Sequence, residues 1–263
     1  MSPPDDAPRP FPTVKRRDRP RPLRLAMRVA YDGGGFRGFQ RQPDQRTVEG
    51  ELMRVFEVAG LGTGLTFASR TDAGVHAEGQ VVAARAPAGT SLDALSAALR
   101  AALPPEVRLV ELRAAPARFH PRWSATGKVY RYVLGASDGP RRWGVPGLDA
   151  ARLAAACDVL LACPSLDGFT AAGAPDKAAP ALEQLTVDRV GDDTVLTFVG
   201  PAFRRYAIRH MVGSIVACAR GELDPDALRE VAARRPPYSG PRAPGEGLVL
   251  VSVRYPTESD PFR

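Results

Sequence analysis

One short segment of the chain places a carboxylate close to a guanidinium, in a setting that could support chemistry. Arg70 and Asp72 lie between two short apolar runs, residues 65–69 and 80–86, which alternate as strands do. Asp72 and Gly74 are turn formers, so a tight, exposed connection is predicted between those strands. A rigid loop can present an ionised carboxylate as a nucleophile, or as a stabiliser of developing positive charge. On spacing alone, an ordinary turn is the simpler interpretation.

The composition indicates a soluble globular protein with a polyanionic partner. The 263 residues are 44% hydrophobic and 25% charged, enough for one large domain or two modest ones. The net charge is +7 and the pI about 9.8. Residues 200–221 carry four arginines and no acidic residue. A genome bias toward Arg explains the excess of Arg over Lys better than it explains such acid-free segments, so nucleic-acid binding is favoured.

Compartment and redox state follow from what the chain lacks. No apolar run approaches the ~20 residues that a membrane span needs. Residues 1–22 carry Pro and Arg where a signal peptide has its apolar stretch. The three cysteines, Cys157, Cys163 and Cys218, have no CxxC spacing, so we expect them to be reduced and buried. These features predict a cytoplasmic protein that is not bound to a membrane.

Two patterns could suggest a bound cofactor, and neither fits its chemistry. Residues 33–38 match the GxGxxG dinucleotide fingerprint, which must open directly into a helix. Here the next predicted helix begins only at Thr47, beyond Pro43. His76, His120 and His210 have no metal-ligand spacing. We therefore predict no nucleotide cofactor and no metal.

The elements that must position Asp72 follow from the hydrophobic periodicity of the first part of the chain. A helix capped by Thr47 and ended by Gly60 has its apolar residues on one face. The order strand, helix, strand, strand, helix, strand is the ferredoxin-like pattern. The predicted strands are residues 23–31, 65–69, 80–86 and 107–113, and the predicted helices are residues 47–60 and 91–103.

The second part of the chain has a similar order of elements. A further helix begins at Asp224, with Pro225 at its first position, and ends at the prolines 236 and 237. The other predicted elements are strands at residues 128–134, 182–190, 194–200 and 248–255 and helices at residues 149–162 and 205–220. The expected fold is α+β, with two ferredoxin-like halves, mainly antiparallel sheets and an active-site cleft between the halves. The expected boundaries are a disordered basic tail at 1–22, domains at 23–114 and 115–257, and a short tail at 258–263.

Several strings of residues resemble one enzyme family. Residues 70–80, Arg-Thr-Asp-Ala-Gly-Val-His-Ala followed after one residue by Gly-Gln, resemble the signature of the TruA family of tRNA pseudouridine synthases. The resemblance continues in order from about residue 25 to residue 256. Its other pieces are residues 31–33, 38–42 and 46–48, with Phe39 where Trp is common, then Phe119-His120, 124–126, 130–132 and Gly247-Leu248.

The resemblance implies a fold, a reaction and roles for named residues. It implies the pseudouridine synthase fold and the isomerisation of uridine to pseudouridine at positions 38–40 of the tRNA anticodon stem-loop. Asp72 takes the position of the catalytic aspartate, and Tyr130 that of the active-site tyrosine. Tyr130 would stack on the uracil and serve as, or relay to, the base that removes the C5 proton. Leu248 would line the uridine pocket.

The same resemblance bears on the substrate, the cofactor and the oligomeric state. The target nucleotide must leave the RNA stack, so Arg70 would fill the vacated space or bind phosphate. The reaction involves no redox change and no hydrolysis, so no cofactor is required. In the family, two subunits form the RNA cleft, which implies a homodimer with tRNA as its partner. We also expect four arginines to bind RNA: Arg37, Arg41, Arg204 and Arg205.

The arginine that pairs with the catalytic aspartate depends on the alignment chosen. The family usually shows Met-Val-Arg-Asn-Ile-Val-Gly-Ser, and this chain has Met211-Val212 followed by Gly213. Aligning on Met-Val would replace the arginine by Gly213. Aligning on Val-Gly-Ser retains Arg209 and matches more of the pattern. We therefore expect Arg209 to be a catalytic residue that keeps Asp72 ionised and lowers its pKa.

Other interpretations stay open. A non-catalytic RNA-binding protein of the same fold would not need Asp72, and a carboxylate-dependent nuclease would need further carboxylates near it to hold Mg²⁺. A synthase acting on another structured RNA would share the whole motif set. Residues 167–180 lack some polar residues of the family pattern, which puts RNA contacts in that segment in doubt.

Overall fold

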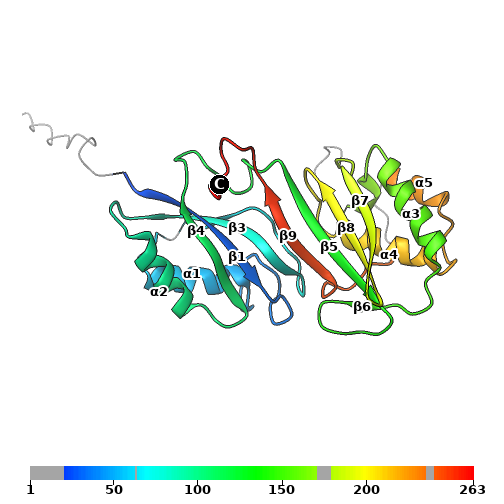
Figure 1. The fold of residues 1–263 in the computed structure, drawn as a ribbon, viewed down its shortest axis with the longest axis horizontal. Coiled ribbons are helices and arrows are strands. Elements are labelled where there is room, and N and C mark those ends of the chain that lie inside the picture. The colour runs from blue at the N-terminus through cyan, green and yellow to red at the C-terminus, as the bar shows by residue number, and fades with distance from the viewer. Residues whose placement is uncertain (1–20, 63, 171–178, 235–239) are drawn as a thin grey trace, which may run out of the picture.

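Nine strands form one continuous sheet in the part of the chain that the computed structural model describes, residues 21–62, 64–170, 179–234 and 240–263. The strand order is β4-β1-β3-β9-β5-β8-β7, with β2 paired to β3 and β6 paired to β5. Helices α1 and α2 lie at one end of this sheet, and α3, α4 and α5 lie at the other (Figure 1). Most of the tail expected at residues 1–22 lies outside the described residues.

Each half of the sheet has the ferredoxin-like strand order that the sequence predicts. The first half contains β1 (Leu23–Tyr31), α1 (Val48–Val58), β2 (Thr66–Phe67), β3 (His76–Ala86), α2 (Leu92–Ala102) and β4 (Val107–Ala114). The second contains β5 (Gly127–Gly135), β6 (Trp143–Gly144), α3 (Ala150–Ala162), β7 (Gln184–Val190), β8 (Asp193–Gly200), α4 (Ala207–Ala219), α5 (Ala227–Ala233) and β9 (Leu248–Arg254). The predicted α+β class is confirmed.

Strand β9 joins the two halves. It pairs antiparallel with β5 and, through His76 and Ala77, parallel with the beginning of β3 (Figure 1). The end of the same edge of β3 is taken by β2, which pairs at Val82 and Ala83. The sequence predicts that β3 begins at residue 80, and this is wrong by four residues. The additional length depends on β9, which comes 170 residues later and leaves no local pattern.

At Gly79, the backbone of β9 lies close against β3. A Cβ atom at this position would lie 2.4 Å from the carbonyl oxygen of Val251, which is backbone and cannot turn aside. We expect Gly79→Ala to lower the free energy of unfolding by about 1–3 kcal/mol, as overpacking does. Gly62→Ala is the matched control, because its Cβ would meet only an ordinary contact at 3.8 Å. Chemical denaturation checks this, and equal stability of the two variants would contradict it.

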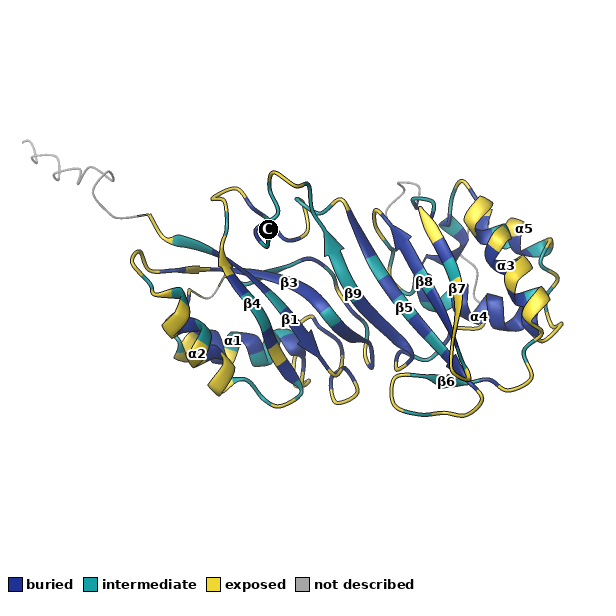
Figure 2. Cartoon of the chain, viewed as in Figure 1, coloured by how far each residue is buried: buried dark blue, intermediate teal, exposed yellow. Residues whose placement is uncertain are grey.

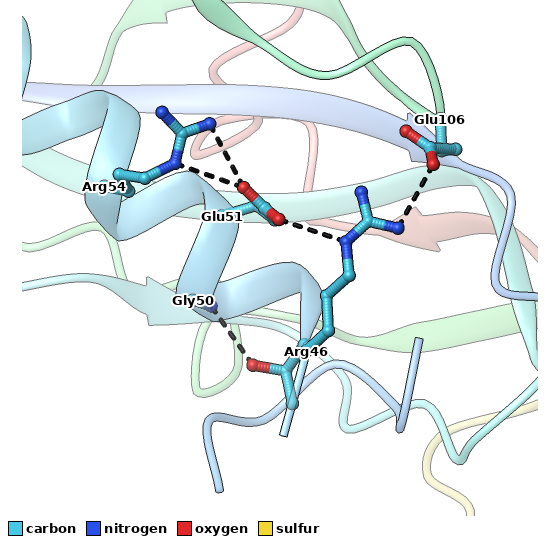
Figure 3. A network of polar contacts seen from close by, with 6 residues as sticks. Arg46, Gly50, Glu51, Arg54 and Glu106 are labelled. Carbon is cyan, nitrogen blue, oxygen red and sulfur yellow. Dashed lines mark hydrogen bonds and ion pairs between the residues drawn. The ribbon is translucent and has the colours of Figure 1, made fainter. Parts of the chain in front are cut away.

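Helix α1 begins where its capping residues predict. The Thr47 side chain accepts a hydrogen bond from the backbone N–H of Gly50 at 3.3 Å. Arg46, just before the helix, binds Glu51 within it and Glu106, which precedes β4, both at 3.1 Å (Figure 3). Arg54 binds the other oxygen of Glu51 (Figure 3). The network ties the helix to the edge of the sheet, although exposed pairs of this kind stabilise proteins only slightly.

Helix α4 is a buried element, unlike the helices beside it. Eleven of its thirteen residues are buried, whereas α3 and α5 expose their outer faces (Figure 2). It begins two residues later than predicted, because Tyr206 has a φ of +65° and interrupts the helical backbone before Ala207. Helix α5 begins at Ala227 rather than Pro225, because Asp224 accepts from the Asp226 N–H and holds this segment in turns. The prolines expected to end it lie outside the described residues.

Three further expectations concern the cysteines, the segment at residues 33–38 and the membrane. The three cysteines are buried and unpaired, as predicted. The segment at residues 33–38, which matches the dinucleotide fingerprint, leads into turns, and α1 begins only at Val48. Over the residues with described positions, none of the helices has the length and apolar character needed to cross a membrane.

Candidate active site

Asp72 lies in the loop between β2 and β3, and neighbouring strands hold this loop from several sides. The Thr71 hydroxyl lies 2.7 Å from the hydroxyl of Tyr31, at the end of β1. The Thr71 carbonyl accepts a hydrogen bond from the Phe39 N–H at 3.0 Å. Gly38 has a φ of +98°, and a Cβ there would lie 2.9 Å from the same carbonyl. The loop is therefore fixed in place by the segment between β1 and α1.

A side-chain amide and two hydroxyls connect this loop to the second half of the sheet. Gln80, which is fully buried in β3, accepts from the Ser69 N–H at 3.1 Å and donates to the Ser69 carbonyl at 2.7 Å. The Ser69 hydroxyl lies 2.7 Å from the hydroxyl of Tyr130 in β5. The ring of Phe203 packs edge-on against Tyr130 at 5.4 Å between centroids. Tyr130 thus reaches the Asp72 loop from the opposite half.

Arg209 in α4 forms an ion pair with Asp72. Its Nη1 lies 3.4 Å from Oδ2 of Asp72, although the two residues are 137 positions apart. The Arg209 Nε donates to the Ala243 carbonyl at 2.8 Å, and the Ala243 N–H donates to the Arg209 carbonyl at 3.0 Å. Gly213, the alternative position in the alignment, packs beneath Pro241, where a Cβ would lie 2.2 Å from a carbonyl oxygen. The structure therefore brings Arg209, not Gly213, to the carboxylate.

The pKa of Asp72 is shifted in the direction opposite to the expected one. Burial raises the pKa of this carboxyl above its usual value, and the attraction of Arg209, Arg205 and Arg242 opposes the rise without cancelling it. The predicted direction is wrong because the loop is largely shielded from water: the Asp72 side chain is only 18% exposed. The arginines hold the pKa down relative to what burial alone would produce.

Tyr130 is a phenol rather than a phenolate at neutral pH. Burial raises the pKa of its hydroxyl to about 12, with the nearby Asp72 charge adding to the rise and the Ser69 hydrogen bond opposing it. It is 5% exposed. A group in this state can stack and can relay a proton through its hydroxyl, whereas direct proton abstraction would first require its ionisation.

The other predicted residues lie at different distances from this centre. Arg70 is exposed in the Asp72 loop, and no hydrogen bond or ion pair of its side chain occurs among the described residues. Arg37 is exposed in the segment between β1 and α1. The backbone carbonyl of the preceding residue, Phe36, accepts a hydrogen bond from the Gly74 N–H of the Asp72 loop. Arg41 lines a surface cavity beside α1 that does not include Asp72. Leu248 is buried at the start of β9, opposite Tyr132 of β5.

Two predicted arginines come just before α4. Arg204 is half-buried, and Arg205 is exposed. The residues expected to show departures from the family pattern lie partly at 171–178, outside the described residues.

Sequence reasoning missed several residues that shape the site. Gln80 is the last residue of the 70–80 string and Ser69 directly precedes the string, and nothing in the sequence indicated the hydrogen bonds between them. Tyr206 and Arg242 gave no signal, because they meet only through the fold: the Arg242 guanidinium lies 4.4 Å from the centre of the Tyr206 ring. Tyr206 is also strained, since a left-handed backbone at a non-glycine residue costs on the order of 1 kcal/mol.

Comparison with known proteins identifies the family to which this site belongs. A family profile described as tRNA pseudouridine synthase matches residues 172–256. The chain is 35% identical to a protein of Paramagnetospirillum magneticum named tRNA pseudouridine synthase A, over 88% of this chain and 95% of that protein. Proteins of the same name from Acidiphilium cryptum and Halalkalibacterium halodurans are 36% and 34% identical, over 91% and 86% of this chain and 98% and 90% of their own lengths.

These similarities, together with the α+β fold and its two ferredoxin-like halves, define a pseudouridine synthase. The chain belongs to the tRNA pseudouridine synthase A family.

Proposed function

We propose that this protein isomerises uridine to pseudouridine in the anticodon stem-loop of tRNA, at positions 38–40, with Asp72 as its catalytic residue. Family membership places the chain among the isomerases that act on tRNA. The observation that supports Asp72 is its ion pair with Arg209, which joins the two halves of the sheet at one carboxylate. The acid-free basic segment at residues 200–221 supports an RNA substrate.

The reaction needs a small set of functions. The bond between N1 and C1′ of uridine breaks, the uracil turns, and C5 joins C1′; C5 then loses its proton, and N1, which carries no proton in uridine, gains one. An ionised carboxylate can attack the sugar or stabilise positive charge at C1′, and both roles require the deprotonated form of Asp72. Arg209 would favour that form and fix the orientation of the carboxylate. Arg70, exposed in the same loop, would occupy the space left by the displaced nucleotide.

Tyr130 would act on the base. We expect Tyr130→Phe to lower the rate of turnover by about a hundredfold or more, the range for loss of a positioned proton-transfer group, while tRNA affinity stays within about twofold. Because the hydroxyl serves the C5 proton, deuterium at C5 should slow this variant more than the wild type. Ser69→Ala is the control, since it removes the partner at 2.7 Å and leaves the Tyr130 hydroxyl in place. Wild-type turnover by Tyr130→Phe would contradict the role.

Mapping the product tests the substrate assignment. Unmodified tRNA is incubated with the protein, and pseudouridines are located by chemical derivatisation and primer extension. The proposal expects modification only within the anticodon arm. Modification of another RNA but not of tRNA would favour a synthase with a different substrate, and RNA binding without modification would favour a non-catalytic protein of the same fold.

We further infer a cytoplasmic homodimer, on the basis of the family resemblance. Two subunits would together form the surface on which tRNA lies, so Arg37 and Arg41 of the first half would add to the binding surface near Arg204 and Arg205 of the second. Light scattering coupled to gel filtration measures the mass of the particle. A monomer at working concentration would contradict the dimer.

A further inference from the structure

Three guanidinium groups surround one tyrosine ring beside Asp72. The guanidinium carbons of Arg242, Arg205 and Arg209 lie 4.4, 4.7 and 5.6 Å from the centre of the Tyr206 ring. Arg205 also donates a hydrogen bond to the Tyr206 hydroxyl at 2.8 Å. Arg209 also makes direct contact with a carboxylate, that of Asp72. Among the described residues, Arg205 and Arg242 share the Tyr206 ring, and neither makes a direct ion pair.

The cluster formed by Tyr206, Arg205, Arg209, Arg242 and Asp72 carries a net positive charge. In the described ranges of the chain, neither Arg205 nor Arg242 makes an ion pair, and both are exposed. His210, whose ring packs against Tyr206, adds no negative charge, and burial lowers its pKa so that it is neutral at neutral pH. Three arginines therefore face the single carboxylate of Asp72, so the cluster keeps a net positive charge and is stabilised when a further anion lies between or beside Arg205 and Arg242.

The Tyr206 ring also holds the guanidinium groups of Arg205 and Arg242 in positions from which they can bind an anion. Stacking on an aromatic ring restrains a guanidinium through its face and leaves its N–H edges available. Those edges match the oxygens of a phosphate. Tyr206 has a left-handed backbone, a strained conformation that is retained only where the surrounding structure enforces it. This backbone places the Tyr206 ring at the beginning of α4. Thirteen helical residues follow, whose dipole adds positive potential at the same end.

We propose that Arg205 and Arg242, held against Tyr206, form a phosphodiester-binding site that binds the RNA backbone next to the nucleotide presented to Asp72. This rests on the proposed function and specifies how the substrate is positioned. The ring holds the two cations at the edge of the reacting centre, while Arg209 stays with the carboxylate. Arg205 and Arg242 are positioning residues, because they fix the backbone and take no part in bond breaking.

Arg242→Gln tests the site against a matched loss of charge elsewhere. Arg54→Gln is the control: Arg54 lies on α1, pairs only with Glu51, and Glu51 keeps its second partner Arg46. For Arg242→Gln we expect KM for tRNA to rise about tenfold or more, and the slope of log affinity against log salt to fall by about one. Arg54→Gln should leave KM within about twofold. Equal behaviour of the two variants would overturn the proposal.

Replacing single RNA phosphates by neutral linkages tests which phosphate contacts Arg242. A methylphosphonate is placed in turn at each phosphate flanking the target uridine, and binding and turnover are measured with wild type and Arg242→Gln. At one linkage we expect wild type to lose about tenfold in affinity and the variant to lose nothing further, as coupled partners do. Losses that multiply at every linkage would overturn the site. Should Arg242→Gln fail to fold, Arg205→Gln, which removes the charge of the other exposed arginine of the proposed site, gives the same comparison.

The binding measurement separates this inference from the proposed function. If wild-type protein binds the RNA but forms no pseudouridine, the proposed function fails, and the methylphosphonate coupling still decides whether the phosphate site exists. If turnover is normal and no linkage couples to Arg242, the phosphate site fails and the proposed function stands.

Discussion

Asp72→Asn is expected to lower the rate of pseudouridine formation by at least about a thousandfold while leaving tRNA binding within about twofold. The substitution keeps the size and planar shape of the side chain, removes its charge and replaces one acceptor oxygen by an NH2 group. A residue that acts on C1′ in the transition state contributes to turnover and little to ground-state binding, so the loss should fall on kcat. Nucleoside analysis of digested tRNA measures the product, and filter binding measures affinity.

The melting temperature of Asp72→Asn is the control that separates lost catalysis from lost folding. Because burial raises the pKa of Asp72 above its value in the unfolded chain, ionising this carboxyl in the folded state costs stability, and that stability is lost as the pH rises through the pKa. Asparagine resembles the neutral form, so Asp72→Asn should not lower the melting temperature at neutral pH. An inactive variant that has also unfolded would leave Asp72 as a structural residue, and full activity would remove it from the mechanism.

Arg209→Ala is expected to reduce turnover by about a hundredfold or more, with a change in pH dependence that a purely structural loss would not produce. Arg209 opposes the burial of Asp72, so its removal should raise the pKa of the carboxyl further. Turnover requires the ionised form and therefore increases as the pH passes through that pKa. The acidic limb of the pH profile should move to higher pH in Arg209→Ala, as measured by the pH dependence of kcat.

Arg205→Ala is the matched comparison, because Arg205 lies four residues away and makes no ion pair with Asp72. It should weaken tRNA binding in a salt-sensitive way and change kcat far less. Loss of turnover in Arg205→Ala with normal kcat in Arg209→Ala would reject the alignment on Val-Gly-Ser, and with it the assignment of Arg209.

The fold was predictable where information is local. Thr47 as a cap and the apolar face of α1 follow from residues within a few positions of one another, and the structure agrees. The early start of β3 at His76 was not predictable, because it depends on pairing with β9 and with Tyr31 at the end of β1, both distant in sequence. The late start of α4 depends on the backbone of Tyr206, which the fold enforces against the residue's own preference.

The candidate site likewise contains residues that could be predicted from the sequence and residues that could not. Asp72, Arg70 and Tyr130 could be proposed because they belong to strings of residues that resemble a family. The ion pair of Asp72 with Arg209 then chooses between two alignments that the strings left open. The pKa of Asp72 was predicted with the wrong sign, because a pairing can be inferred from sequence but the depth of burial cannot. Arg242 went unnoticed for a related reason: its partner Tyr206 is brought to it by the fold.

The release of tritium from tRNA labelled at C5 of uridine tests the central claim most directly, because forming pseudouridine breaks that C–H bond. Wild type and Asp72→Asn are compared at enzyme concentrations that bind all of the tRNA, so that affinity does not enter. We expect wild type to release one tritium for each pseudouridine formed, and Asp72→Asn, with tRNA bound, to release none above background. Release by Asp72→Asn at the wild-type rate, or no release by wild type, would contradict it.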